Sequence, residues 1–217
     1  KKRGFIVSKK AFHPHEALNH GEGTRQNMYD LKELRKAMKE VQTSKRFEHT
    51  KGVEYICAAL AMRYGASMED ALTAGLLHDC AKCLTDDKLL SICEKHGLII
   101  TAAEKKQLFL LHSKAGACLA EHKYGITNQD ILNAIRSHTT GRPEMSLLEK
   151  IVFVADYIEP GRKEAANLSD IRRLAFEDLD RTVLKILEDT LKYLEESGSE
   201  IDPRTCETWE YYHTNVD

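Results

Sequence analysis

Start signals for helices recur along this chain, and hardly any strand signal accompanies them. A Ser or Thr followed three residues later by an acidic residue begins four segments, at 67–70, 101–104, 127–130 and 146–149. Such a pair satisfies free backbone N–H groups at a helix N-terminus. Each pair precedes apolar residues at helical spacing, and no alternating strand pattern or Asn-Gly hairpin is found. The sequence therefore predicts an all-α fold of eight to ten helices.

The length of 217 residues suits one domain with appendages. Residues 1–28 show no apolar period and are expected to form an irregular N-terminal appendage. Residues 29–197 are interpreted as one compact helical domain, and 198–217 as a C-terminal tail. Helix ends are expected at Gly65, Gly97, Gly125 and Gly141, because glycine readily adopts the left-handed conformation that stops a helix.

Charge and composition exclude several classes of protein. With 34 acidic and 32 basic residues, the formal net charge of −2 argues against binding of nucleic acid through phosphate neutralisation. No apolar run approaches 18 residues, so no membrane span or membrane partner is expected. The basic start, residues 1–7, lacks the pattern of a secretory signal. Six cysteines lie mostly within apolar helical patterns, which predicts reduced thiols and a cytoplasmic location.

Histidines and aspartates stand next to apolar runs at separate places in the chain. His78 and Asp79 follow a run at 71–77 that is apolar almost all round, as in a buried helix. Asp156 follows a second apolar run. His49 shares a helical face with apolar residues and is expected to point inward. A charged carboxylate beside such runs is costly to bury unless a metal or a partner compensates it.

These four residues predict a metal site with ligands from three helices: His49, His78, Asp79 and Asp156. Mixed nitrogen and oxygen ligands suit iron, manganese, cobalt or zinc. Such an ion lowers the pKa of bound water and neutralises phosphate charge, which favours attack on phosphorus. Each residue alone also fits a structural role, as a buried histidine or a salt-bridged aspartate. Their occurrence together, in this order and with these flanks, favours the metal.

Five segments together resemble the HD phosphohydrolase superfamily. They also resemble, more narrowly, the YqeK-type symmetrical diadenosine-tetraphosphate hydrolases. The segments lie at 46–50, 75–82, 111–113, 137–141 and 154–162. The resemblance extends over roughly 60% of the chain and makes 29–197 an HD-type metal-dependent phosphohydrolase domain. It implies a cytoplasmic enzyme that hydrolyses diadenosine tetraphosphate to two ADP molecules.

The resemblance also implies roles for individual residues. The metal would be iron or another transition metal, as one or two ions, on the four predicted ligands. Catalytic roles are implied for Asp79, Lys82, His112 and His138. A nucleoside diphosphate would lie against Arg46, Asp79, Lys82, His112, His138, Asp156 and Arg162. In the tail, Ile201 and Thr205 match only loosely the residues that hold the nucleotide in the family.

Alternatives stay open at this point. His112 and His138 could bind phosphate oxygens, protonate the leaving group or hold a second metal ion. The same site could serve a nucleotidase acting on other nucleotides, or a sensor that binds a nucleotide without turnover. A homodimer is implied by the resemblance alone. Cys80 and Cys83 have the spacing of a redox or zinc motif, but no second pair accompanies them.

Overall fold

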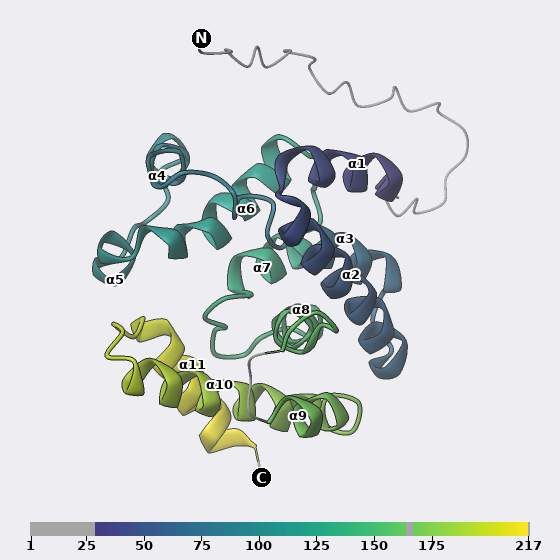
Figure 1. Cartoon of the computed structure of the whole chain (residues 1–217), viewed down its shortest axis with the longest axis vertical. Helices are drawn as coiled ribbons and strands as arrows, with labels where there is room; N and C mark the ends of the chain where they lie inside the picture. The colour runs from purple at the N-terminus through teal and green to yellow at the C-terminus, as the bar shows by residue number, and fades with distance from the viewer. Residues whose placement is uncertain (1–28, 164–166, 217) are drawn as a thin grey trace.

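The computed structural model describes residues 29–163 and 167–216, and this part of the chain is all-α (Figure 1). Residues 1–28, with the expected irregular appendage, lie outside the described residues. The helices are α1 (Leu31–Val41), α2 (Ser44–Tyr64), α3 (Met68–Leu77), α4 (Asp86–Lys95), α5 (Ala102–Lys106), the 3-10 turn η1 (Leu108–Leu110), α6 (Leu111–His122), α7 (Gln129–Ser137), α8 (Leu147–Ile158), α9 (Leu168–Leu174), α10 (Leu179–Glu196) and α11 (Pro203–Asn215).

The predicted fold class is confirmed, since no strand occurs within 29–163 or 167–216. Eleven α-helices are described, one more than the upper end of the expected range. The short ones account for the difference: α5 has five residues and α9 has seven. Segments of that length hold at most two turns, so they carry little periodic signal in the sequence.

Three of the four predicted helix starts are found, and one is displaced. Ser67, Thr101 and Ser146 are N-caps whose side chains accept a backbone N–H. The expected cap at Thr127 is wrong, because Asn128 caps α7 and its Oδ1 accepts from the Asp130 N–H at 2.9 Å. The hydroxyl of Tyr29 accepts the Thr127 N–H and lies 3.3 Å from the Thr127 hydroxyl. Thr127 therefore precedes the helix and contacts Tyr29 instead of capping α7.

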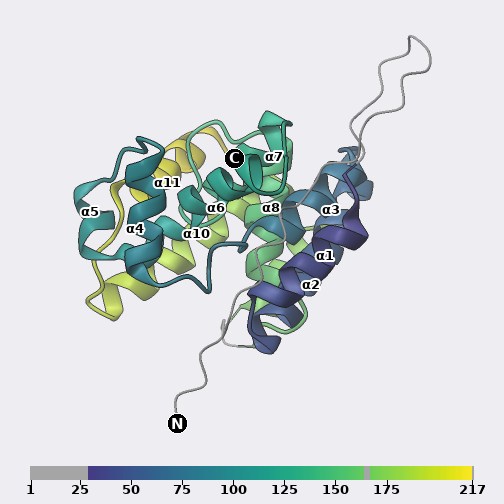
Figure 2. The same ribbon diagram turned by 90° about the horizontal axis from the view of Figure 1, so that it is seen from above.

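Helix α3 contributes to the larger hydrophobic core and packs against α1, α2, α7 and α8 (Figures 1 and 2). The apolar run expected to be buried is confirmed, with Leu76 and Leu77 fully buried. Helices α2 and α3 approach closely at Gly75, where an added Cβ would lie 2.8 Å from the Cys57 Sγ and 3.0 Å from the Glu54 Cα. This close approach brings the side chains of α2 next to the end of α3.

A second, smaller core joins α4 to α6. Its buried members are Ala81, Leu89, Cys93, Leu111 and Ala115. Helix α8 lies in the larger core, with α7, α9 and α10 packed against it. The segment expected to be a tail contains α11, which packs on α10 (Figure 2). The domain boundary at 197 stays a prediction.

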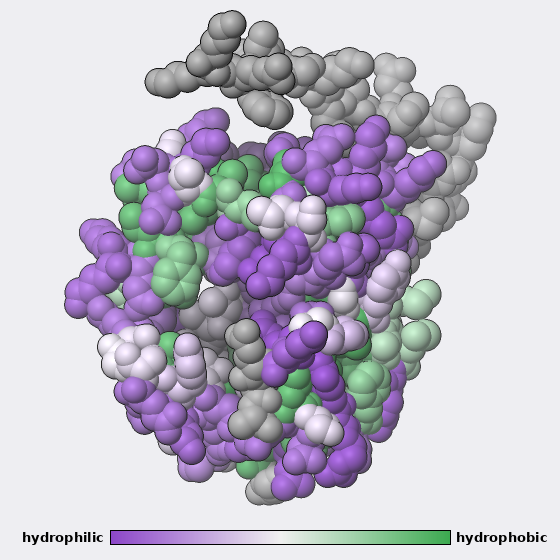
Figure 3. Space-filling view, viewed as in Figure 1, coloured by the Kyte–Doolittle hydropathy of each residue, from purple (hydrophilic) through white to green (hydrophobic). Residues whose placement is uncertain are grey.

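The outer surface is largely hydrophilic on the face shown in Figure 3, with hydrophobic side chains in smaller patches. None of the described helices combines the length and the apolar character that crossing a membrane requires. All six cysteines are free, as the sequence predicts, and four of them are buried: Cys57, Cys80, Cys93 and Cys118.

The fully buried carboxylate of Glu149 links the loop after α7 to the start of α8. Its oxygens accept from the Arg142 Nε at 2.7 Å, the Ser137 hydroxyl at 2.9 Å and the Ser146 N–H at 2.7 Å. Burial by itself raises the pKa of Glu149, but the hydrogen bonds from Arg142, Ser146 and Ser137 outweigh it and lower the pKa below its ordinary value of 4.5. Ser137 precedes His138, so this network fixes the end of α7.

We expect Glu149→Gln to lower the free energy of unfolding by about 2–3 kcal/mol. Breaking a fully buried ion pair costs roughly 3–5 kcal/mol, and Arg142 is 35% exposed. Urea denaturation at pH 7 measures the change. Glu188→Gln removes an exposed partner of Lys185 and serves as the control, with an expected cost of less than about 1 kcal/mol.

The same variant has a pH signature. A carboxyl whose pKa is lowered by folding contributes stability above its unfolded-state pKa, and this contribution is lost as the pH falls through the folded-state value. The wild-type protein should therefore lose more stability than Glu149→Gln when the pH is lowered below about 4.5. If the wild-type protein and Glu149→Gln lost the same amount of stability as the pH was lowered, the charge of Glu149 would not contribute to stability.

Candidate metal centre

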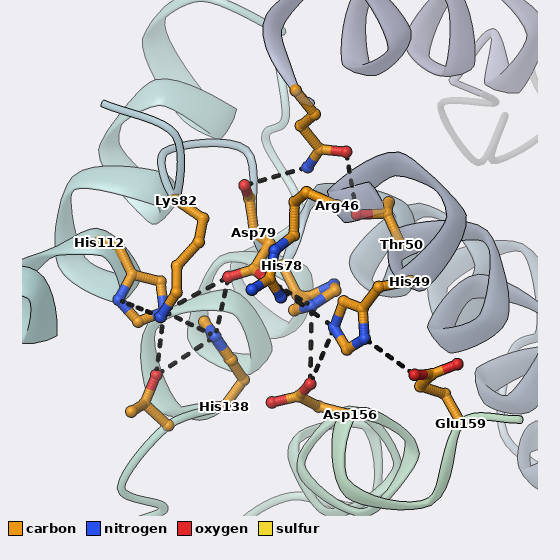
Figure 4. Close-up of polar contacts among 12 residues, drawn as sticks. Arg46, His49, Thr50, His78, Asp79, Lys82, His112, His138, Asp156 and Glu159 are labelled. Carbon is orange, nitrogen blue, oxygen red and sulfur yellow. Dashed lines mark hydrogen bonds and ion pairs between the residues drawn. The ribbon is translucent and has the colours of Figure 1, made fainter. Parts of the chain in front are cut away.

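Five helices bring the predicted residues to one place in the core (Figure 4). Helix α2 supplies His49, and the C-terminal end of α3 supplies His78 and Asp79. Helix α8 supplies Asp156. His112 comes from the first turn of α6 and His138 from the C-terminal end of α7, and both are buried.

Three of the four histidines are oriented by the same backbone contact. The Nδ1–H of His78 donates to the Gly75 carbonyl at 2.7 Å, and His138 donates to Ile135 at 2.7 Å. His112 donates in the same way to the Phe109 carbonyl at 2.6 Å. In each case the acceptor lies three residues earlier in the chain. With Nδ1 bonded to a backbone carbonyl, each ring turns its Nε2 towards the centre of the site, the orientation of histidines that bind metals.

The fourth histidine is oriented by a carboxylate. The His49 Nδ1–H donates to the Glu159 Oε1 at 3.2 Å, which directs Nε2 towards Asp156 and Asp79. The His49 Nε2 lies 3.0 Å from the Asp156 Oδ1 and 3.9 Å from the Asp79 Oδ2. The His78 Nε2 lies 3.4 Å from the same Asp79 oxygen. All four predicted ligands therefore converge on one point.

Asp79 faces a second pair of histidines with its other oxygen. The Asp79 Oδ1 lies 3.4 Å from the His112 Nε2 and 3.6 Å from the His138 Nε2. These two nitrogens are 3.2 Å apart. Two neutral rings would bring lone pairs together at that distance, so a positive charge or a shared proton is needed between them. Asp79, His112 and His138 thus form a second group that could hold an ion, adjoining the group of His49, His78 and Asp79.

The electrostatics favour charged carboxylates at the centre. Burial alone would raise the pKa of Asp79, but the positive charge of the nearby His78 and His138 imidazoles holds it well below its ordinary value. Burial acts on Asp156 in the same direction, and the adjacent imidazole of His49, 3.0 Å away, and the charge on His78 again lower the pKa. Both groups are therefore charged at neutral pH.

His112, in contrast to the two carboxylates, is uncharged at neutral pH. Burial, followed by the nearby charge of His138, lowers the pKa of His112 to about 3. A neutral His112 suits an acceptor or a metal ligand better than a proton donor. Its Nε2 accepts from the Lys82 Nζ at 3.3 Å, and burial lowers the pKa of this lysine.

The donor atoms fit a divalent metal ion. The His49 Nε2, the His78 Nε2 and the Asp79 Oδ1 are buried without a hydrogen-bond partner. Buried polar atoms are rarely left in that state. Imidazole nitrogens and carboxylate oxygens together match the preferences of first-row divalent ions. His49, His78, Asp79 and Asp156 could hold one ion, with His112 and His138 beside it.

Three cationic side chains surround this cluster. The Arg46 Nη1 donates to the Asp79 Oδ2 at 2.8 Å, and the Arg162 Nη2 lies 3.4 Å from the Asp156 Oδ1. Both guanidinium groups are about one third exposed. Each has five N–H donors, so further donors remain for an anion on the solvent side. Lys82 lies beside His112, with its Nζ 3.3 Å from the His112 Nε2 (Figure 4).

Several residues of the site were not assigned from the sequence. Glu159 orients His49 and also accepts the Gly161 N–H at 2.6 Å. The Thr139 hydroxyl lies 3.2 Å from the His138 Nε2 and 3.3 Å from the His112 Nε2. The Gln42 amide donates to the Asp79 carbonyl at 3.1 Å. Glu159 and Thr139 lie within segments that carry the family resemblance, but nothing in the sequence marks Gln42.

The two predicted tail residues make no hydrogen bond to the cluster within the described part of the chain. Among the hydrogen bonds of the described residues, none joins Ile201 or Thr205 to a histidine or aspartate of the site. Helix α11 does reach the adjoining loop at Thr208, whose Cγ2 would lie 2.8 Å from a Cβ added to Gly141. The left-handed backbone of Gly141 (φ 65°) and this contact both require glycine. A nucleotide contact for Ile201 and Thr205 stays a prediction.

A comparison with protein families identifies the domain that carries these residues. The HD domain family matches residues 46–161, more than half of the chain. The chain belongs to the HD domain family. This confirms the family resemblance of the sequence, and all four predicted ligands lie within the matched residues.

Relatives of known name cover most of the chain. The symmetrical bis(5'-nucleosyl)-tetraphosphatase of Bacillus subtilis (strain 168) is 35% identical over 80% of this chain and 92% of its own length. The enzyme of the same name from Halalkalibacterium halodurans is 37% identical over 77% of this chain and 88% of its own. A crystal structure described as a predicted HD superfamily hydrolase involved in NAD metabolism, from Clostridium acetobutylicum, is 38% identical. It covers 87% of this chain with a TM-score of 0.84.

The position of Asp79 between both groups of histidines makes its charge decisive for metal binding. We expect Asp79→Asn to weaken the binding of manganese at least about tenfold, since even residues that only orient ligands contribute 10–100-fold. Elemental analysis after gel filtration measures manganese per chain, and circular dichroism checks the helices. Asp170→Asn, in the exposed part of α9, is the control. A full equivalent of manganese in Asp79→Asn would place the ion elsewhere.

Proposed function

We propose that this protein is a metal-dependent hydrolase that cleaves dinucleoside tetraphosphates symmetrically into two nucleoside diphosphates. The observation that carries the proposal is the convergence of four imidazole Nε2 atoms on Asp79 and Asp156, with three cations around them. The names of the relatives from Bacillus and Halalkalibacterium support this substrate. In this proposal diadenosine tetraphosphate gives two ADP molecules.

The metal is held by His49, His78, Asp79 and Asp156 in this proposal. When bound, it acts as a Lewis acid that activates water and neutralises phosphate charge. We propose iron as the ion, with manganese, cobalt or zinc as alternatives. A second ion beside Asp79, His112 and His138 is compatible with their geometry.

The cations bind and orient the polyphosphate. Arg46 and Arg162 already contact the two carboxylates, so their remaining N–H donors can hold phosphate oxygens close to the metal ligands. Lys82 adds a third cation beside His112, whose Nε2 accepts a hydrogen bond from the Lys82 Nζ at 3.3 Å. A chain of four phosphates carries several negative charges, and the three side chains lie beside the cluster. The nucleotide would therefore contact Arg46, Lys82 and Arg162 in addition to the histidines.

The leaving group places modest demands on acid catalysis. A nucleoside diphosphate leaves with a terminal phosphate whose second pKa is near 6, as in other phosphate monoesters, so it departs without full protonation at neutral pH. Neutral His112 is consistent with this, because it serves as an acceptor for Lys82 and Thr139. Charge neutralisation by Lys82 and the arginines then stabilises the transition state.

Two alternative functions differ from this proposal, one in its substrate and the other in the absence of hydrolysis. A nucleotidase would use the same ligands on mononucleotides, and a sensor would bind a nucleotide without hydrolysis. The complete set of charged carboxylates and inward-facing histidines favours an enzyme over a sensor. A cytoplasmic location, a homodimer and the nucleotide contacts of Ile201 and Thr205 belong to the same proposal and remain predictions.

The position of bond cleavage separates symmetrical hydrolysis from the alternatives. We expect early products of diadenosine tetraphosphate to be ADP alone, with oxygen from labelled water in only one of the two molecules. Chromatography and mass spectrometry of the products measure both. ATP together with AMP would contradict symmetrical cleavage and leave the metal centre standing. Faster turnover of mononucleotides would favour the nucleotidase, and binding without turnover would favour the sensor.

Lys82 and Arg162 test the placement of the polyphosphate. Loss of one hydrogen bond to a charged group costs roughly 1.5–3 kcal/mol, and each 1.36 kcal/mol is about a factor of ten in rate. We expect Lys82→Met and Arg162→Met to retain the metal and to lower kcat/KM by about tenfold or more. Lys88→Met, in the exposed part of α4, is the matched control. Wild-type kinetics in both variants would place the polyphosphate on another surface.

A further inference from the structure

A second group of ligand-type side chains lies away from the HD centre, where the ends of α4 and α6 meet. His96 follows the last residue of α4, and Cys118 and His122 stand one turn apart on α6. One ligand atom of each residue lies within 4.8 Å of the other two. None of the three belongs to the site described above, and the proposed function does not use them.

The spacing of Cys118 and His122 suits a shared metal ion. Residues four apart lie on the same face of a helix. The Cys118 Sγ lies 3.7 Å from the His122 Nδ1. In a tetrahedral zinc site with Zn–S near 2.3 Å and Zn–N near 2.05 Å, these two atoms would be about 3.6 Å apart. The sulfur and nitrogen therefore already have nearly the separation that one zinc ion requires.

His96 adds a third ligand from the neighbouring helix. Its ring lies 4.4 Å from that of His122 between centroids, with a tilt of 57° between the planes. Cys118 is 6% exposed and His122 is exposed, so the sulfur is shielded while one side of the group is open to solvent. We propose that His96, Cys118 and His122 form a binding site for a zinc-class divalent ion, separate from the HD centre. Three protein ligands leave one tetrahedral position open.

The contacts without a metal also have an ordinary explanation. The His122 Nδ1 lies 3.0 Å from the Cys118 carbonyl, and its N–H can donate there as in many helix ends. Binding through Nδ1 would replace this hydrogen bond. Burial, followed by the charge of Glu121, raises the pKa of Cys118, so binding of the ion would release the thiol proton.

The position of the site gives it a structural consequence. Helices α4 and α6 are joined by the smaller hydrophobic core, which has only five buried members. A core of that size contributes little by itself, and a metal clip between two elements is a common addition in such cases. An ion on His96, Cys118 and His122 would tie the C-terminal end of α4 to that of α6. The opposite end of α6 carries His112.

Cobalt(II) tests the proposal because a thiolate ligand gives it a near-ultraviolet charge-transfer band. The HD centre has no cysteine ligand, so cobalt there does not produce this band. We expect the metal-free full-length protein to develop the band on titration with cobalt. Cys118→Ser should abolish it, and His122→Gln should weaken cobalt binding by at least about tenfold, as loss of a ligand does. Zinc should compete for the same band and raise the melting temperature.

Controls separate this site from other thiols and from the HD centre. Cys83→Ser, which removes an exposed thiol, should keep the band. The double variant His49→Ala and Asp156→Ala should also keep it, because those residues are not ligands here. His122→Gln changes an exposed side chain and stays informative if Cys118→Ser fails to fold. Absence of the band in the wild type, its persistence in Cys118→Ser and His122→Gln, or its loss in Cys83→Ser would each overturn the proposal.

Discussion

Asp79 holds a charged carboxylate inside an α-helical core, where an uncompensated charge would destabilise the fold by several kcal/mol. Its compensation comes from two sides: Arg46 and His78 approach one oxygen, and His138 approaches the other. The surrounding groups are thus arranged around a single negative charge. A divalent ion would extend this arrangement, because it satisfies the imidazole nitrogens that the aspartate leaves without hydrogen bonds.

The ends of helices do much of the orienting. The last carbonyls of a helix have no N–H partner within it, so they are free to accept from side chains. His78 and His138 are the C-caps of α3 and α7, and each donates its Nδ1–H to a carbonyl of the helix that it ends. This hydrogen bond gives the free backbone carbonyl a partner and turns the Nε2 towards the site. Local helix termination therefore fixes the tautomer and the direction of two ligands without any additional side chain.

A feature of the site could be predicted from the sequence where residues close to it in the chain cause it. His49 and Asp156 were found because apolar neighbours at helical spacing predict burial, and a buried ionisable group needs a partner. Glu159 and Gln42 were not assigned, because their contacts cross between segments and leave no periodic trace. The cap at Thr127 was also misplaced. Two adjacent residues could both cap α7, and the structure uses Asn128, whose Oδ1 accepts the Asp130 N–H.

The two hydrophobic cores divide the site between them. Leu77 and Ala155, which adjoin His78 and Asp156, belong to the larger core around α3. Ala81 and Leu111 belong to the smaller core under α4 and α6, and they adjoin Lys82 and His112. The predicted metal ligands thus adjoin the larger core, while the flank with Lys82, which is proposed to bind phosphate, adjoins the smaller core. Changes in the packing of α4 on α6 will therefore displace Lys82 and His112 before they displace the predicted metal ligands.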